Sequence, residues 1–450
     1  MHQRLGTDSP ASEMKPELLQ RILEELKDLR SQTLGVVIDA GSQWCKVGFA
    51  GDAEPRASFP TLISRPCYPG VYVSMTHKDV YVGHEAWSKR RTWRLRHPIE
   101  RGIVTNWDGM EKVFHHTFYN ELRVAPEEQP VLLTEGLLNP KANREMLAQV
   151  MFETFNVPAM WLGSRAVLAL FAAGRASGLV IESGAQISWA APVVEGCLVA
   201  HAAFALELGG HHITERLTSL LCGVGINLSS TEETRLVADD IKQRLAFVES
   251  DYDLACHAAD QAAQNERLGG ARIACTHYSC PEWFVRMGNP EGFSIRTDVL
   301  FRCAEALFSP SLLLVEGAAA TLEGSPAAET RGLADIAHDA LMACDASVRA
   351  ELAANVVLAG GTMQLRGVAG RLQRELASLL PAGMEVQVAT PTDPQLMVWR
   401  GSSYLAWLHL REDLWESAGW IRYDEYDEVG PTIVHRKVGI GCFMTKLLYM

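Results

Sequence analysis

The chain lacks three features that would place it in common classes of protein. No uninterrupted apolar run approaches about 18 residues, so no membrane span is expected. Its ten cysteines follow no regular framework and no signal peptide opens the chain, so we expect reduced thiols in the cytoplasm or nucleus. Acidic residues outnumber basic ones, and the net charge of −13 argues against direct binding of nucleic acid.

What the chain does have is a repeated glycine turn. An apolar strand that runs into an acidic residue and then a glycine occurs as Val36–Ser42 and again as Leu179–Ala185, and Val356–Thr362 has a similar character. Buried strands that end in glycine-rich turns direct backbone N–H groups at phosphate. Two matched copies in a chain of 450 residues predict two related halves that close on one nucleotide.

The residues around these turns resemble actin closely. The resemblance is strongest in Glu111–Met160, and it continues in Cys45–Pro60, His97–Lys112 and Glu425–Lys437. It covers about Leu34–Lys437 and identifies the chain as a divergent member of the actin family. It implies an α/β fold of the class shared by actin, the Hsp70 chaperones and the sugar kinases. That class is a duplicated two-domain fold with a nucleotide cleft between the domains.

The resemblance also implies how the chain is divided. The expected parts are an N-terminal extension (1–33), domain I (34–172 plus 397–437), domain II (173–396) and a C-terminal tail (438–450). Within domain I, about 61–97 resembles the loop that actin inserts into a neighbouring subunit. Domain II carries an insertion within about 250–300 that includes Cys275 and Cys280. We expect a surface loop there, because a second ligand pair at the spacing of a zinc site is missing.

Two helices are predicted from local patterns. Lys15–Arg30 carries an apolar stripe on one face, so it would dock on a partner or pack back on its own body. Asn139 and Pro140 predict the start of a second helix, with Asn139 as the N-cap and with Leu147 and Met151 on the buried face.

The resemblance assigns a nucleotide site to particular residues. The matching positions are Asp39, Gly41, Ser42, Gln43, Lys46, Glu182, Gly184, Gly210, Lys242, Gly360, Gly361 and Thr362. In both phosphate hairpins a glutamine, Gln43 or Gln186, replaces the family's glycine, which lets the backbone approach phosphate. Such a side chain either crowds the terminal phosphate or donates to it, and the sequence does not decide. The resemblance thus implies binding of ATP or ADP, with weakened affinity.

The expected Mg²⁺ environment and catalytic pair are altered further. Asp39 and Glu182 remain as acidic residues that would hold Mg²⁺ weakly, through water, while Ala185 replaces a third carboxylate. Arg165 and Trp189 replace the glutamine and histidine that orient the attacking water in the family. No catalytic residue is therefore expected, since an indole has no acceptor for a proton. The alternative is that Arg165 stabilises transition-state charge as an arginine finger.

These features lead to three hypotheses of function. The first is a divergent actin-like cytoskeletal protein, resembling the germ-cell (testis) actin-like proteins, that hydrolyses ATP poorly or not at all. It would act through assembly with other actin-family or actin-binding proteins in the cytoplasm and cytoskeleton, using an apolar groove at Phe171, Leu405 and Leu408. The second is a filament-forming ATPase with a rewired site. The third is an actin-related subunit of a nuclear chromatin complex.

Overall fold

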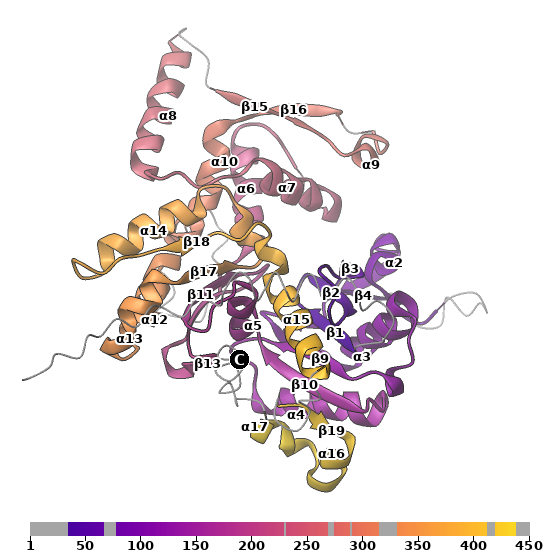
Figure 1. Ribbon diagram of the computed structural model, residues 1–450. Helices are drawn as coiled ribbons and strands as arrows, with labels where there is room; N and C mark the ends of the chain where they lie inside the picture. Colours follow the sequence, from indigo (N-terminus) through magenta and orange to yellow (C-terminus); the bar gives the residue numbers. More distant parts are fainter. Residues whose placement is uncertain are drawn as a thin grey trace, which may run out of the picture.

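The computed structural model describes residues 35–66, 78–228, 231–268, 274–288, 290–314, 331–411 and 419–437 of the chain. The predicted helix Lys15–Arg30, part of the predicted inserting loop and the tail 438–450 lie outside the described residues. Two large sheets form the centre of the molecule, and helices α5 (Arg165–Ala172) and α15 (Met397–Arg411) lie between them (Figure 1). This architecture confirms the predicted α/β class and the two-domain fold.

The first sheet has six strands in the described part of the chain. In spatial order they are β19 (Ile421–Arg422), β10 (Ala159–Ser164), β9 (Val131–Glu135), β1 (Val36–Ala40), β2 (Trp44–Phe49) and β3 (Ala57–Pro60). Strand β1 pairs antiparallel with β2, to which a tight turn joins it, and parallel with β9. We call the half of the molecule built on this sheet the first domain.

The second sheet repeats this arrangement. Its strands are β13 (Cys197–Leu198), β12 (Ser188–Val194), β11 (Gly178–Ser183), β17 (Val356–Ala359) and β18 (Val388–Ala389), with β14 (Phe204–Leu206) paired to β12. Strand β11 pairs antiparallel with β12 and parallel with β17, as β1 does with β2 and β9. The three glycine-turn segments seen in the sequence are thus β1, β11 and β17, and the half built on this sheet is the second domain.

Three small sheets complete the strands of the described residues. They are β5 (Tyr81–Val82) with β4 (Ile63–Pro66) and β6 (Trp93–Arg96), the hairpin β7 (Ile99–Glu100) with β8 (Ile103–Val104), and the hairpin β15 (Cys275–Ser279) with β16 (Gly292–Arg296). The last of these lies in the predicted insertion, far from the first sheet in Figure 1.

The remaining helices cover the sheets or extend from them. They are α2 (Gly83–Ser88), α3 (Trp107–His115), α4 (Lys141–Gln149), α6 (Gly210–Gly223), α7 (Glu232–Leu245), α8 (Tyr252–Arg267), α9 (Glu282–Val285), α10 (Thr297–Ala304), α11 (Ser311–Leu314), α12 (Leu333–Met342), α13 (Ala346–Ala354), α14 (Val368–Leu379), α16 (Tyr423–Val429) and α17 (Val434–Lys437). Shorter 3₁₀ or π segments are η1 (His116–Leu122), η2 (Pro126–Glu128), η3 (Val150–Thr154), η4 (Ala200–Ala202), η5 (Glu305–Leu307), η7 (Gly361–Gln364), η8 (Pro394–Leu396) and η10 (Pro431–Ile433).

Alternating side chains of β1 explain why the first sheet needs helices on both faces. Val36 and Ile38 pack in a cluster with Met110 of α3, whereas Val37 packs with Trp399 and Trp407 of α15. A central strand buried on both faces reads as a continuous apolar run, as β1 and β11 do. Because β1 runs parallel to β9, and β11 to β17, the polar ends of these strands lie at one edge of each sheet, where α/β folds place ligand sites.

Helix α4 differs from its prediction at its first turn. It begins at Lys141 with Pro140 at the N-cap, and Asn139 does not cap it. The Asn139 amide instead donates to Oε1 of Glu135 at 2.9 Å, since that buried carboxylate at the end of β9 is within reach. The predicted buried face is confirmed, because Leu147 and Met151 are buried.

Candidate nucleotide cleft

A cavity of about 650 Å³ lies between the two domains, where β1 and β11 end. Its lining includes these predicted nucleotide-site residues: Gly41, Ser42, Gln43, Lys46, Glu182, Gly184, Gly210, Lys242, Gly360, Gly361 and Thr362. Asp39 does not line the cavity, because its side chain is buried beneath it. Residues from five separate stretches of sequence are therefore brought to one place, as the resemblance implied.

Strand register places the charged groups of the cleft. In the hairpin of the first domain, Asp39 lies directly opposite Lys46, and the Lys46 ammonium donates to Oδ2 of Asp39 at 3.1 Å. Glu182 lies at the matching position in β11, opposite Trp189 on β12. The two acidic residues thus face each other from different domains.

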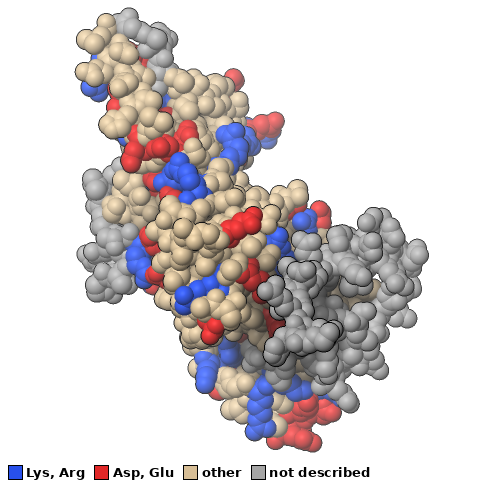
Figure 2. All heavy atoms as spheres, turned by 60° about the vertical axis from the view of Figure 1, so that its left-hand side comes forward, with Lys and Arg blue, Asp and Glu red and all other residues tan. Residues whose placement is uncertain are grey.

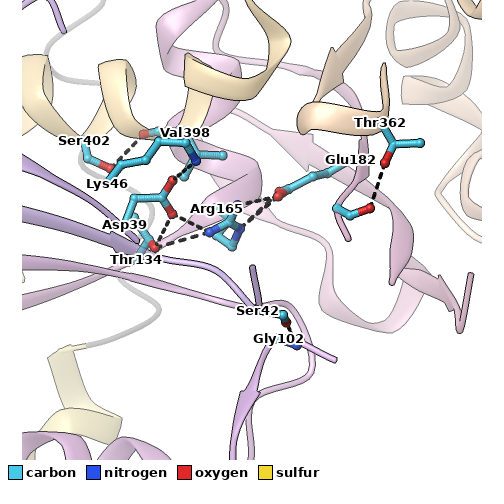
Figure 3. Close-up of polar contacts among 11 residues, drawn as sticks. Asp39, Ser42, Lys46, Gly102, Thr134, Arg165, Glu182, Thr362, Val398 and Ser402 are labelled. Atoms are coloured by element: carbon cyan, nitrogen blue, oxygen red, sulfur yellow. Dashed lines mark hydrogen bonds and ion pairs between the residues drawn. The ribbon is translucent and has the colours of Figure 1, made fainter. Parts of the chain in front are cut away.

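Arg165 lies between these two carboxylates and binds both (Figure 3). It is the first residue of α5, directly after β10. Its Nη1 donates to Oδ1 of Asp39 at 2.5 Å, and its Nε donates to Oε1 and Oε2 of Glu182 at 3.0 and 3.2 Å. Its Nη2 also pairs with Glu182. The guanidinium therefore links the first domain to the second inside the cleft.

The environment of Asp39 keeps it ionised. Burial raises the pKa of this carboxyl, but the charges of Arg165 and then Lys46, together with a hydrogen bond from Thr134, hold the pKa well below its ordinary value. Burial lowers the pKa of Arg165, and the charges of Asp39 and Glu182 more than offset this and raise it. Two cations and two anions consequently form a closed, nearly neutral group.

This group does not fit a hydrated Mg²⁺ ion. Every oxygen of the Asp39 and Glu182 carboxylates already accepts from Arg165 or Lys46. Mg²⁺ needs octahedral oxygen ligands, mostly water held by free carboxylates. The third expected carboxylate is Ala185, which has no oxygen on its side chain. As arranged here, a tethered guanidinium takes the place where the resemblance would put the ion.

Trp189 belongs to the core as much as to the cleft. It is buried and packs with Ala166, Val180 and Val398, and it also contributes to the cavity wall. An apolar indole at this point gives an attacking water no base to accept its proton. The predicted loss of catalysis stays a prediction, which a measurement of hydrolysis would test.

On the nucleoside side, the predicted residues hold one another in position. The Lys242 ammonium donates to the Gly210 carbonyl at 3.0 Å and to Oγ1 of Thr214 at 2.9 Å, and it pairs with Asp239. The Thr362 hydroxyl donates to the Gly184 carbonyl at 2.8 Å. These contacts fix the pocket wall.

The two hairpin glutamines behave differently. Gln43 lines the cavity, whereas the Gln186 side chain accepts a hydrogen bond from the Arg101 backbone amide at 2.6 Å. The next amide, that of Gly102, donates to the Ser42 hydroxyl at 2.9 Å. The turn between β7 and β8 therefore contacts the tips of both phosphate hairpins, which the sequence alone did not reveal.

Sequence reasoning also missed Thr134, which donates to Oδ1 of Asp39 at 2.8 Å. A signal for it was present, because Thr134 follows the apolar run of β9 and so lies at the same sheet edge as Asp39. No such signal exists for Arg101, since its neighbours in the second domain are far away in sequence.

The predicted partner groove is not supported at the residues named for it. Phe171 and Leu405 are buried in the core cluster between α5, α15 and the second sheet. Leu408 is half-buried and packs on a different cluster, beside Trp407 and Trp420. These side chains stabilise the junction of the domains. Their apolar character in the sequence fits a buried core and an exposed groove equally well, so the sequence did not distinguish the two.

Two other features are absent from the described residues. No helix in the described ranges is both long and apolar enough to cross a membrane. In the same part of the chain, no group of three or more His, Cys, Asp or Glu side chains is arranged to hold a metal ion.

Comparison with known proteins agrees with the geometry. The chain matches the family model for actin over residues 30–439, which include both sheets and the cleft. Members of this family typically bind a nucleotide together with Mg²⁺, and many belong to the cytoskeleton. On a match that covers most of its length, the chain belongs to the actin family.

Proposed function

We propose that this actin-family protein is a structural component that works through protein–protein assembly and hydrolyses ATP poorly or not at all. The single observation that carries the proposal is the Arg165 guanidinium bound between Asp39 and Glu182. It neutralises the carboxylates on which the metal-dependent chemistry of the family depends. Binding of ATP or ADP remains part of the proposal, in weakened form, because the pocket residues are in place.

The charge balance of the cleft supports weak nucleotide binding. Polyphosphate recognition requires cationic groups that are free to face the phosphates. Lys46 and Arg165 are already paired with Asp39 and Glu182, so a nucleotide gains their full attraction only by breaking those pairs. The same pairing argues against Arg165 as an arginine finger, because that role needs the guanidinium at the reacting phosphate.

Hydrolysis is the direct test of this proposal. In single-turnover assays with Mg-ATP, the wild-type chain should release phosphate far more slowly than conventional actin under matched polymerising conditions. The double variant Arg165→Gln with Trp189→His should release phosphate faster than wild type, because it restores the side chains that orient water. Each single variant should fall short of the double variant, since the two groups act on one water molecule.

Exposed Arg56, which pairs with Asp52 away from the cleft, supplies the control variant Arg56→Gln. It should leave phosphate release unchanged. A wild-type rate equal to that of actin would refute the proposal and favour the filament-forming ATPase. A fold check by circular dichroism accompanies the double variant, because Trp189 is buried.

Nucleotide affinity should depend less on Mg²⁺ here than in conventional actin. The reason is that Arg165 already supplies positive charge at the place where the ion would lie. ATP affinity can be titrated by calorimetry with Mg²⁺ and then with EDTA. A tenfold or greater loss on chelation, about 1.4 kcal/mol, would contradict this expectation.

Assembly with other actin-family or actin-binding proteins, in the cytoplasm and cytoskeleton, is the remaining part of the proposal. Among its described residues, the face seen in Figure 2 carries Lys and Arg interspersed with Asp and Glu, and no broad basic area that would suit nucleic acid. The amphipathic stripe of Lys15–Arg30 supports a role in docking, since a helix this short is marginal alone in water.

A further inference from the structure

The outer mouth of the cleft carries contacts that are separate from the Arg165 group. At the inner end of this mouth, the two-residue turn Arg101–Gly102 joins β7 to β8. Both residues have positive φ, 50° at Arg101 and 77° at Gly102. This is the geometry of a tight hairpin turn whose amides point outward. The turn belongs to the first domain, and it reaches Gln186 and Glu207 of the second.

The turn makes two direct contacts across the cleft. Its Arg101 amide donates to Oε1 of Gln186 at 2.6 Å, and the Arg101 guanidinium donates to Glu207 at 2.9 Å. Both partners come from the second domain, Gln186 from a phosphate hairpin and Glu207 from the residue after β14. One residue thus joins the domains through its backbone and its side chain together.

A second set of contacts crosses the mouth farther out. Arg90, in the turn after α2, donates to Oε1 of Glu233 in the first turn of α7 at 3.1 Å, and Nε of Arg91 lies 3.5 Å from the same oxygen. The Arg90 guanidinium also lies 5.0 Å from the centre of the Trp87 ring and donates to the Trp87 backbone carbonyl, so contacts within its own domain orient it. Arg91 further contacts the Met287 sulfur.

The Glu233 carboxylate is suited to joining the two domains through Arg90. A hydrogen bond from its own backbone amide at the start of α7, followed by the charge of Arg90, outweighs the effect of burial and lowers the pKa of Glu233. Its side chain is 15% exposed and that of Arg90 18%. This pair is therefore less screened by solvent than a typical surface pair, whose contribution is small.

We infer that Arg90, Arg91 and Arg101 with Gln186, Glu207 and Glu233 form a latch that holds the two domains closed without nucleotide. Beside the inner contacts lies an open, polar cavity of about 980 Å³, lined by Arg101 of the first domain and by Gln186 and Glu207 of the second. The domains therefore meet here through polar rather than apolar surface. Closure at the mouth of the cleft therefore depends on these polar contacts, in addition to the Arg165 link deeper in the cleft. The latch uses none of the Arg165 contacts, so its test is independent of the hydrolysis test.

The experiment compares domain closure in nucleotide-free protein. The full chain is treated with apyrase and EDTA, and small-angle X-ray scattering is combined with hydrogen exchange at the Arg101 amide. The test variant is Glu207→Gln with Glu233→Gln. The control is Glu282→Gln with Asp424→Asn, which also removes two negative charges. Each of these residues belongs to an exposed ion pair whose two members lie in the same domain as each other.

Nucleotide-free wild type and control should be as compact as protein with added ATP. The test variant should have a larger radius of gyration and at least about tenfold faster exchange at Arg101, equivalent to about 1.4 kcal/mol. Wild type should open in the same way as NaCl rises to about 1 M, where charges are screened within about 3 Å. An open wild type at low salt, or a test variant as closed as the control, would overturn the inference.

Discussion

Replacing Arg165 with alanine should destabilise the protein by about 3 kcal/mol or more, one of the largest losses that a single substitution in this chain can cause. The variant leaves the buried carboxylates of Asp39 and Glu182 without their shared cation, and like charges then face each other across the cleft. Thermal unfolding by scanning calorimetry measures the loss. Arg56→Ala, at an exposed pair, should cost less than about 1 kcal/mol.

The dependence of this loss on pH identifies its cause. In wild type the pKa of Asp39 is lowered, so its stabilising effect is present above the unfolded pKa of about 3.9 and is lost as pH falls below it. In the variant Asp39 keeps Lys46 but loses the larger charge effect of Arg165, so its pKa lies higher than in wild type and protonation relieves part of the loss as pH falls. The gap between wild type and variant should therefore narrow from about pH 7 to about pH 4.

Adding Glu182→Gln to Arg165→Ala should recover part of the lost stability at neutral pH, because it removes the buried charge that Arg165 had paired. A loss that neither narrows with pH nor responds to Glu182→Gln would mean that Arg165 acts through packing alone.

Gly360→Ala should also be strongly destabilising, by about 3 kcal/mol or more when backbone strain and overpacking are combined. Gly360 has φ of 90°, and a Cβ atom there would overlap the Ser183 carbonyl oxygen and approach Cγ of Glu182 to 3.1 Å. The neighbouring Gly361 offers a matched control, since a Cβ at that position meets nothing within 4 Å.

Gly361→Ala should change stability by less than about 0.5 kcal/mol. Chemical denaturation of both variants measures the difference, and crystallography of Gly360→Ala would show the second phosphate hairpin displaced. Equal effects of the two substitutions would contradict the close approach of β17 to β11 at this point.

The amino-acid sequence by itself determined the fold and most of the wall of the cleft. Apolar strands that end in an acidic residue and glycine can be recognised locally, because burial on both sheet faces requires a continuous apolar run. The predicted residues Gly41, Gly184 and Gly360 therefore line one cavity, as expected. The replacements at Arg165 and Trp189 were likewise visible in the sequence, as departures from the actin pattern.

Only the tertiary structure decided which groups those replacements contact. Whether Arg165 faces phosphate or carboxylate depends on Asp39 and Glu182, which approach it from two separate sheets. The same holds for Arg101, whose partners in the second domain are distant in sequence, and for Asn139, which bonds Glu135 instead of capping a helix. Local patterns specify which faces are buried, whereas pairings of charged and polar groups depend on how the domains meet in space.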